Sequence, residues 1–139
     1  MLSDIRKAFE KKLIIMPDGL GKANTGFESV EFKPNNNLPY QLSRLITLPV
    51  ENPTLGDGYY REVGFYQVVL SYKRGEGAGA IQAMADKIQS YFKRGTTLVE
   101  GSTKIIVDRT PEQSPIYIND TRAEITIRIR YYSEQIQAN

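Results

Sequence analysis

The chain of 139 residues contains no cysteine, no histidine and no tryptophan. Without cysteine it can form no disulfide, no thiolate metal site and no thiol nucleophile. Without histidine it lacks the side chain whose unperturbed pKa lies closest to neutrality, which removes the common serine–histidine, cysteine–histidine and histidine–metal chemistries. Carboxylate or lysine catalysis stays formally open, but no pair of acids stands at a meaningful spacing. We therefore expect a protein that is not an enzyme and that holds no metal or cofactor.

Long hydrophobic runs are also absent. No apolar stretch approaches the roughly 20 residues of a membrane span, and the first residues lack the pattern of a signal peptide. We therefore expect use in the cytoplasm and no membrane partner. The net charge of +2 is far from that of a dedicated nucleic-acid binder. Basic groups prevail in residues 73–94 and acidic groups in residues 14–72, which is either ordinary solvated surface or complementarity between neighbouring subunits.

Strand patterns dominate what is present. Residues 121–132, TRAEITIRIRYY, alternate strictly between isoleucines on one side and arginine, glutamate or threonine on the other. This period of two indicates a long strand in a sheet with one dry face. A strand whose second face is wet favours antiparallel or mixed pairing.

Helical spacing appears in two segments that could cover the dry face. Residues 3–13 predict a short N-terminal helix, and residues 78–94 predict the main helix, which we expect to pack on one face of the sheet. The chain is therefore predicted to be a single α+β domain over residues 1–139. Further strands are predicted over residues 27–33, 42–48, 59–73, 104–108 and 115–118, followed by a polar tail over residues 133–139.

The strand predicted over residues 59–73 has an unusual second face. Tyr66 and its alternate neighbours suit a core, but Phe65 and Val69 stand among polar residues on the other side. These two side chains need cover, and a subunit contact and the N-terminal helix are equally acceptable candidates. The segment exceeds the usual strand length of roughly 3–10 residues, so Gly64 predicts a bulge or a bend.

A glycine-rich turn, from Gly75 to Gly79, stands between this strand and the main helix. Such turns can present backbone N–H groups to a phosphate, but the spacing is not that of a dinucleotide or phosphate-loop motif, and Glu76 would repel phosphate. The turn is more simply a tight one that needs positive φ and close helix–sheet approach. A nucleic-acid or nucleotide binding module that uses this turn and basic surface remains the alternative function.

The whole arrangement resembles a known family. The predicted N-terminal helix is followed by FESVEF, a G-x-Y-Y loop, the segment GFYQVVLSYKRGEGAGAIQAMADKIQSYFKRGTTL and the closing PIYINDTRAEITIRIRYY. Over about Leu2 to Tyr132, these features resemble the tail terminator-like proteins of long-tailed bacteriophages, a group that includes minor tail and tail-completion proteins. One departure is Ser29, which stands where related chains often carry asparagine after an aromatic residue and a glutamate.

The resemblance implies an α+β subunit that forms a ring, commonly a hexamer, at the end of the tail tube. Such a ring terminates tail polymerisation and offers a surface for joining head to tail. The implied partners are other copies of the chain, the tail tube protein and head–tail connector proteins, with nucleic acid at most an incidental contact. The implied location is the tail of the virion, assembled in the cytoplasm of the host bacterium.

A closed ring requires a heterologous interface, in which one patch meets a different patch. We expect one side of that contact to include Tyr59, Tyr60, Phe65 and Val69. We also expect two residues of the polar loop over 50–58 to meet the tube or a neighbouring copy, namely Leu55 and Asp57.

Overall fold

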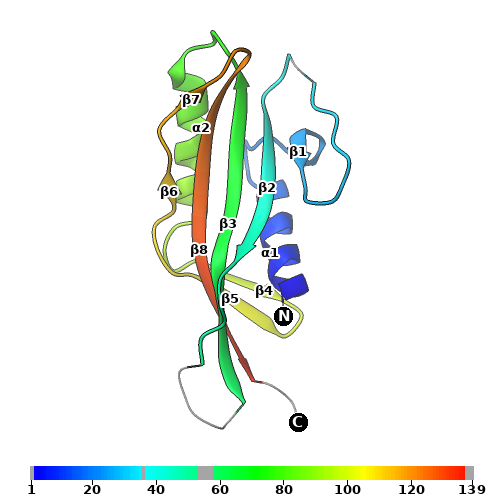
Figure 1. The fold of residues 1–139 in the computed structure, drawn as a ribbon, viewed down its shortest axis with the longest axis vertical. Coiled ribbons are helices and arrows are strands. Elements are labelled where there is room, and N and C mark those ends of the chain that lie inside the picture. The colour runs from blue at the N-terminus through cyan, green and yellow to red at the C-terminus, as the bar shows by residue number, and fades with distance from the viewer. Residues whose placement is uncertain (1, 36, 53–57, 137–139) are drawn as a thin grey trace.

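The computed structural model describes residues 2–35, 37–52 and 58–136, and every structural statement below concerns these residues. They form a curled sheet with two α-helices behind it in the view of Figure 1. In chain order the elements are α1 (Leu2–Ile14), a 3-10 turn η1 (Lys22–Asn24), β1 (Thr25–Gly26), β2 (Tyr40–Thr47), β3 (Tyr59–Lys73), α2 (Ala78–Tyr91), β4 (Thr97–Glu100), β5 (Thr103–Val107), β6 (Glu112–Gln113), β7 (Tyr117–Ile118) and β8 (Arg122–Ile136).

The sheet is mixed, which confirms the predicted α+β class. Its strands follow the order β1-β2-β3-β8-β5-β4, and β6 and β7 also pair with β8. The short pair of β1 with β2 is parallel, and the other strand pairs are antiparallel. One edge of β8 therefore pairs with β3 along its whole length. The other edge pairs with three short strands one after another, β7, β6 and β5.

The two longest strands, β3 and β8, form the centre of the fold. They pair without interruption from Tyr59 opposite Ile136 to Lys73 opposite Arg122. The bulge predicted at Gly64 is therefore wrong. The glycine is required there because a Cβ atom would lie 2.3 Å from the carbonyl oxygen of Ile46 on the neighbouring strand.

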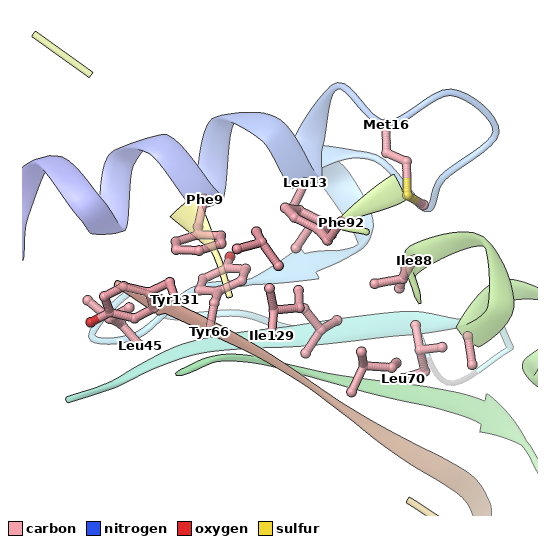
Figure 2. Close-up of a cluster of buried hydrophobic side chains, with 14 of the residues drawn as sticks. Phe9, Leu13, Met16, Leu45, Tyr66, Leu70, Ile88, Phe92, Ile129 and Tyr131 are labelled. Atoms are coloured by element: carbon pink, nitrogen blue, oxygen red, sulfur yellow. The ribbon is translucent and has the colours of Figure 1, made fainter. Parts of the chain in front are cut away.

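Both helices pack on the same face of the sheet and form the core with it. Phe9 of α1 stacks on Tyr66 of β3 with ring centroids 4.8 Å apart, and it also contacts Tyr131 of β8 at 5.5 Å. Figure 2 shows α1 above the sheet with Phe9 pointing down onto these two tyrosines. From α2 the buried residues are Ile81, Met84, Ala85 and Ile88. The prediction that the main helix covers the dry face is confirmed.

Several shorter elements differ from the prediction. Residues 27–33 form no strand, and the chain there folds as a loop after the two-residue strand β1. In this loop the centre of the Phe32 ring lies 5.8 Å from that of Tyr40 on β2. The hairpin of β4 and β5 was only half predicted, because the pattern of TLVE was missed. β8 continues to Ile136, so the first residues of the expected polar tail belong to the sheet.

Candidate interaction surface

We call the side of β2, β3 and β8 that faces away from the helices the outer face. Phe65, Gln67 and Val69 of β3 lie on it, because the alternate residues Tyr66 and Val68 are buried in the core. Both Phe65 and Val69 are half-buried. In the described parts of the chain no helix covers this face, which excludes the N-terminal helix as the cover for these two residues.

Charged and polar groups surround the apolar residues of the outer face. The guanidinium carbon of Arg128 lies 5.7 Å from the centre of the Phe65 ring, and Arg128 Nε donates to Gln67 Oε1 at 3.3 Å. Arg130 Nε lies 3.6 Å from Asp108. The face is therefore a mixed surface of the kind that proteins use for contacts with other proteins, with apolar positions inside a polar rim.

At the β2 edge, the loop of residues 27–34 folds back over the outer face and creates a groove of about 540 Å³. Val30 is 62% exposed and Leu42 is 40% exposed in it, and Val69 lies at its base. Gly26 permits the close approach of the loop, since a Cβ there would lie 2.6 Å from Leu42 Cδ2 and 2.9 Å from Phe32. The groove thus presents apolar side chains that the described residues do not cover.

One carboxylate holds this groove to the rest of the fold. Glu28 Oε1 accepts a hydrogen bond from the Leu45 backbone N–H at 2.6 Å and from Arg6 of α1 at 2.6 Å. Burial by itself raises the pKa of Glu28, but the hydrogen bonds from Arg6 and Leu45 outweigh it and hold the pKa below its usual value. Glu28 is therefore charged at neutral pH and fastens the loop to both β2 and α1.

The opposite edge of the sheet carries β6 and β7. A hollow of about 320 Å³ opens there, lined by Glu112 and Gln113 together with outer-face residues of β3 and β8. Gln113 donates to Gln89 and Asp86 of α2 at 2.9 and 3.0 Å, which ties this edge to the helix. Beyond the hollow, Tyr117 of β7 is 65% exposed, and its neighbour Ile118 is 58% exposed. This edge therefore projects apolar side chains.

The four predicted interface residues do not form one patch. Phe65 and Val69 share the outer face. Tyr59 stands an even number of residues from both, so its side chain points to the same side of β3, but it lies at the start of the strand, about 20 Å from Phe65. The side chain of Tyr60 points to the opposite side of β3. The two predicted loop residues, Leu55 and Asp57, lie outside the described residues.

Tyr59 belongs to a projecting ribbon, where the start of β3 pairs with the end of β8 at the bottom of Figure 1. Arg61 in this ribbon contacts Glu134 at 3.0 Å and Glu51 at 3.8 Å. Hydrogen bonds from Tyr59 and Arg61 lower the pKa of Glu134, and the hydrogen bond to Glu134 raises the pKa of Tyr59. The ribbon thus carries a network of charges on its exposed strands.

The glycine-rich turn has the conformation of a plain connection. Gly75 and Gly77 have φ of 95° and 83°, as predicted. Close helix–sheet approach is not the reason for them, because a Cβ at Gly75, Gly77 or Gly79 would meet no atom within 4 Å. The strands on either side of α2 do not form the parallel unit of a dinucleotide-binding fold.

The described residues contain no group of three or more aspartate or glutamate side chains placed to hold a metal ion. Neither of the helices in this part of the chain has the length and apolar content needed to cross a membrane.

Sequence reasoning missed the groove and β6, whereas β7 falls within the strand predicted over residues 115–118. The groove was missed because the residues that form its loop, 27–33, were predicted to be a strand. β6 has only two residues, too few for a periodic pattern. Nothing in the sequence indicated that β7 would lie at an edge of the sheet beside β8.

Comparisons with known proteins bear on the fold and on the family of the chain. No curated protein sequence matches the chain. A solved structure that carries no functional description is similar over 100% of this chain and 99% of its own, with a TM-score of 0.78 and 18% sequence identity. That likeness supports the fold alone. The sequence itself matches the phage tail terminator proteins over residues 4–131, and the chain therefore belongs to this family of phage tail components.

Proposed function

We propose that copies of this chain assemble as a ring, a hexamer in the commonest form, at the end of the phage tail tube. The ring ends tube polymerisation and offers the surface to which the head or its connector proteins bind. The role is structural and non-enzymatic, and the protein is part of the tail in the finished virion. The observation that carries the proposal is the outer face with Phe65 and Val69, which no helix in the described residues covers and which the loop of residues 27–34 covers only at the β2 edge.

The energetics favour a partner on this face. Full burial of one large apolar side chain contributes about 1.5–3 kcal/mol relative to leaving it exposed, and Phe65 and Val69 are both half-buried in the single chain. Sister copies that cover them, together with the groove at the β2 edge, would gain this free energy on assembly. A ring also needs two different patches on each copy, and the outer face offers different chemistry at its two edges.

The proposed mechanism is capping. One end of the ring binds the last layer of tube subunits and covers the surface to which the next tube subunit would bind. Because its other end has no surface equivalent to that of a tube subunit, no further tube subunit can add. The projecting ribbon of β3 and β8 is one element that extends far enough from the body of the subunit to make such a contact. Tyr59 and Tyr60 would then contact the tube, and the same role is proposed for Leu55 and Asp57 of the adjoining loop.

A double substitution on the outer face tests the proposal. Phe65→Asp with Val69→Asp places two charges in the proposed contact, so rings should be lost and tails made with this variant should be overlong or headless. Ring mass in solution and tail length in electron micrographs are the measurements. Val99→Asp is the matched control, because Val99 is 67% exposed on β4, away from the outer face. Normal rings and normal tails with the double variant would overturn the assignment of this face.

A further inference from the structure

The apolar groove at the β2 edge and the exposed β7 edge suggest a specific joint between copies. We propose that the groove between residues 27–34 and β2 of one copy receives Tyr117 of the next copy, while Arg44, which lines the groove, meets Glu112 of that next copy. This inference rests on the proposed self-assembly and specifies which two surfaces meet. Its first support is that the two edges lie at matching heights on the sheet.

The first row of paired residues crosses the whole sheet. Tyr40 of β2 lies opposite Ser71 of β3, and Ser71 lies opposite Glu124 of β8. Glu124 in turn lies opposite Tyr117 of β7. Tyr40 and Arg44 both line the groove, which therefore spans the level of this row and that of Arg44. Its Tyr40 end stands at the level of Tyr117, three strand spacings or about 14 Å away.

A second row crosses the sheet four residues further along. Arg44 of β2 lies opposite Gln67 of β3, and Gln67 lies opposite Arg128 of β8. Arg128 lies opposite Glu112 of β6. Both edges therefore carry an apolar feature at one level and a charge at the next. The charges at the second level have opposite signs, and both Arg44 and Glu112 are exposed.

The geometry of these rows fits a closed ring. Paired residues share a face of the sheet, so the groove, Arg44, Tyr117 and Glu112 all belong to the outer face. They lie on opposite edges, with β7 and β1 on the two sides of the sheet in Figure 1. Joining one edge to the other is a heterologous contact. Because both features match in height when the copies stand parallel, each copy can follow the last without a rise. A ring requires this together with a rotation between copies that closes.

The chemistry of the two sides also matches. The groove offers Val30 and Leu42, which are exposed, and β7 offers an aromatic side chain that is 65% exposed. Tyrosine suits this role, since its ring fills an apolar pocket while its hydroxyl stays wet. Glu28, the acidic residue of the groove, is already bound to Arg6 and to the Leu45 N–H. Of the two charged residues that line the groove, Glu28 and Arg44, Arg44 is the exposed one.

Charge reversal tests the pairing. Arg44→Glu and Glu112→Arg should each weaken self-association by about tenfold or more, because like charges would face each other in every joint. An equimolar mixture of the two variants should restore the ring, since each joint then brings one acid against one base. Lys87→Glu on the exposed side of α2 is the control and should assemble normally. Mass measurement in solution across protein concentration gives the result.

Cross-linking tests the contact without depending on a strong ring. The natural chain contains no cysteine, so Leu42→Cys with Tyr117→Cys introduces the sole reactive pair. Oxidation of this variant in assembled tails should produce a ladder of covalent oligomers that ends at the ring. Either single variant should give no ladder. Ile15→Cys with Val99→Cys is the matched control, because both residues are exposed and stand outside the two rows.

The outcomes separate this inference from the proposed function. A ladder from the cysteine pair and rescue in the charge mixture support the joint described. Normal rings from both charge variants, with no ladder, overturn the joint while leaving a ring function intact. Absence of any self-association by the natural protein, together with normal tails in its absence, overturns both proposals.

Discussion

Ser29 has a left-handed backbone, with φ of 62°, in the loop that builds the groove. This conformation costs an L-residue about 1–2 kcal/mol, and asparagine tolerates it better than serine does. We predict that Ser29→Asn raises the free energy of unfolding by about 0.5–1 kcal/mol, measured as a higher urea midpoint at unchanged slope. Ser102→Asn, in a turn without positive φ, should give no gain, and a lower midpoint for Ser29→Asn would contradict the argument.

Gly64 and Gly79 make a contrasting pair. Gly64→Ala would place a methyl group 2.3 Å from the Ile46 carbonyl oxygen inside the sheet, so we predict a loss of about 2–3 kcal/mol in the free energy of unfolding. Gly79→Ala meets no atom within 4 Å and lies in the first turn of α2, so it should raise the free energy by about 0.5 kcal/mol. Thermal or denaturant unfolding of both variants is the measurement. A harmless Gly64→Ala would show that the strands can separate there.

Individual residues were the hardest to predict from the sequence. Arg122 stands on the side of β8 that the pattern presents as wet, yet it is 8% exposed. Its guanidinium donates to the Ser71 side chain and carbonyl at 2.9 and 2.7 Å and to the Leu38 carbonyl at 3.1 Å. These acceptors are distant in sequence, and periodicity carries no information on which chain segment will arrive beside a given side chain.

Helix α1 depends on its contact with the sheet, because a helix of 13 residues is marginal alone. Phe9 supplies its largest buried side chain and contacts both central tyrosines. We predict that Phe9→Ala lowers the free energy of unfolding by about 3–5 kcal/mol, measured by denaturant titration. Leu2→Ala, at a residue that is 46% exposed on the same helix, should change it little. Equal effects of the two substitutions would refute the described docking of α1.

The loop of residues 27–34 is joined to α1 and β2 through Glu28, and this joint should depend on pH. The pKa of Glu28 is lower in the folded protein than in the unfolded chain, so its ionised form favours folding. That stability is present above the unfolded pKa and is lost as the pH falls through the folded pKa. We predict that Glu28→Gln lowers the free energy of unfolding at pH 7 by about 1 kcal/mol.

The comparison of the two proteins across pH gives the check for Glu28. The natural protein should lose more stability than Glu28→Gln between neutral and acidic pH, so their unfolding curves should converge at low pH. Glu76→Gln, in the exposed turn before α2, serves as the control and should follow the natural protein throughout. Parallel curves for the natural protein and Glu28→Gln would show that the carboxylate contributes nothing through its charge.

Elements with sustained periodicity were predicted well. α1, α2, β3 and β8 are each 13 or more residues long, and the apolar pattern within each indicates which face meets the core. β6 and β7 have two residues each, so their place beside β8 is decided by the long strand and not by their own sequence. The wrongly predicted strand over residues 27–33 shows that alternation over a few residues also occurs in a loop.

At the scale of the whole molecule, the sequence indicated that β3 has a second apolar face but not what the face would meet. Phe65 and Val69 were identified only by their alternate positions along the predicted strand, on the side opposite Tyr66. The pairing of the groove with β7 could not be predicted, because it depends on the register of four strands, of which the central two, β3 and β8, are far apart in the chain. Register is a property of the assembled sheet, and only the structure shows that Arg44 and Glu112 stand in one row.

Assembly should be visible in the stability of the whole protein. Association of folded chains stabilises the folded state by mass action, because the unfolded chain cannot form the contact. We predict that the Tm of the natural protein rises by several degrees as its concentration is raised about a hundredfold, by scanning calorimetry. The Phe65→Asp, Val69→Asp variant should lose this dependence, whereas Val99→Asp should keep it. Retention of the concentration dependence by the Phe65→Asp, Val69→Asp variant would contradict the assignment of the outer face as the surface that assembly buries. A Tm of the natural protein that does not change over concentrations at which the ring is seen by mass would mean that the ring dissociates before the chains unfold, and the prediction would be wrong.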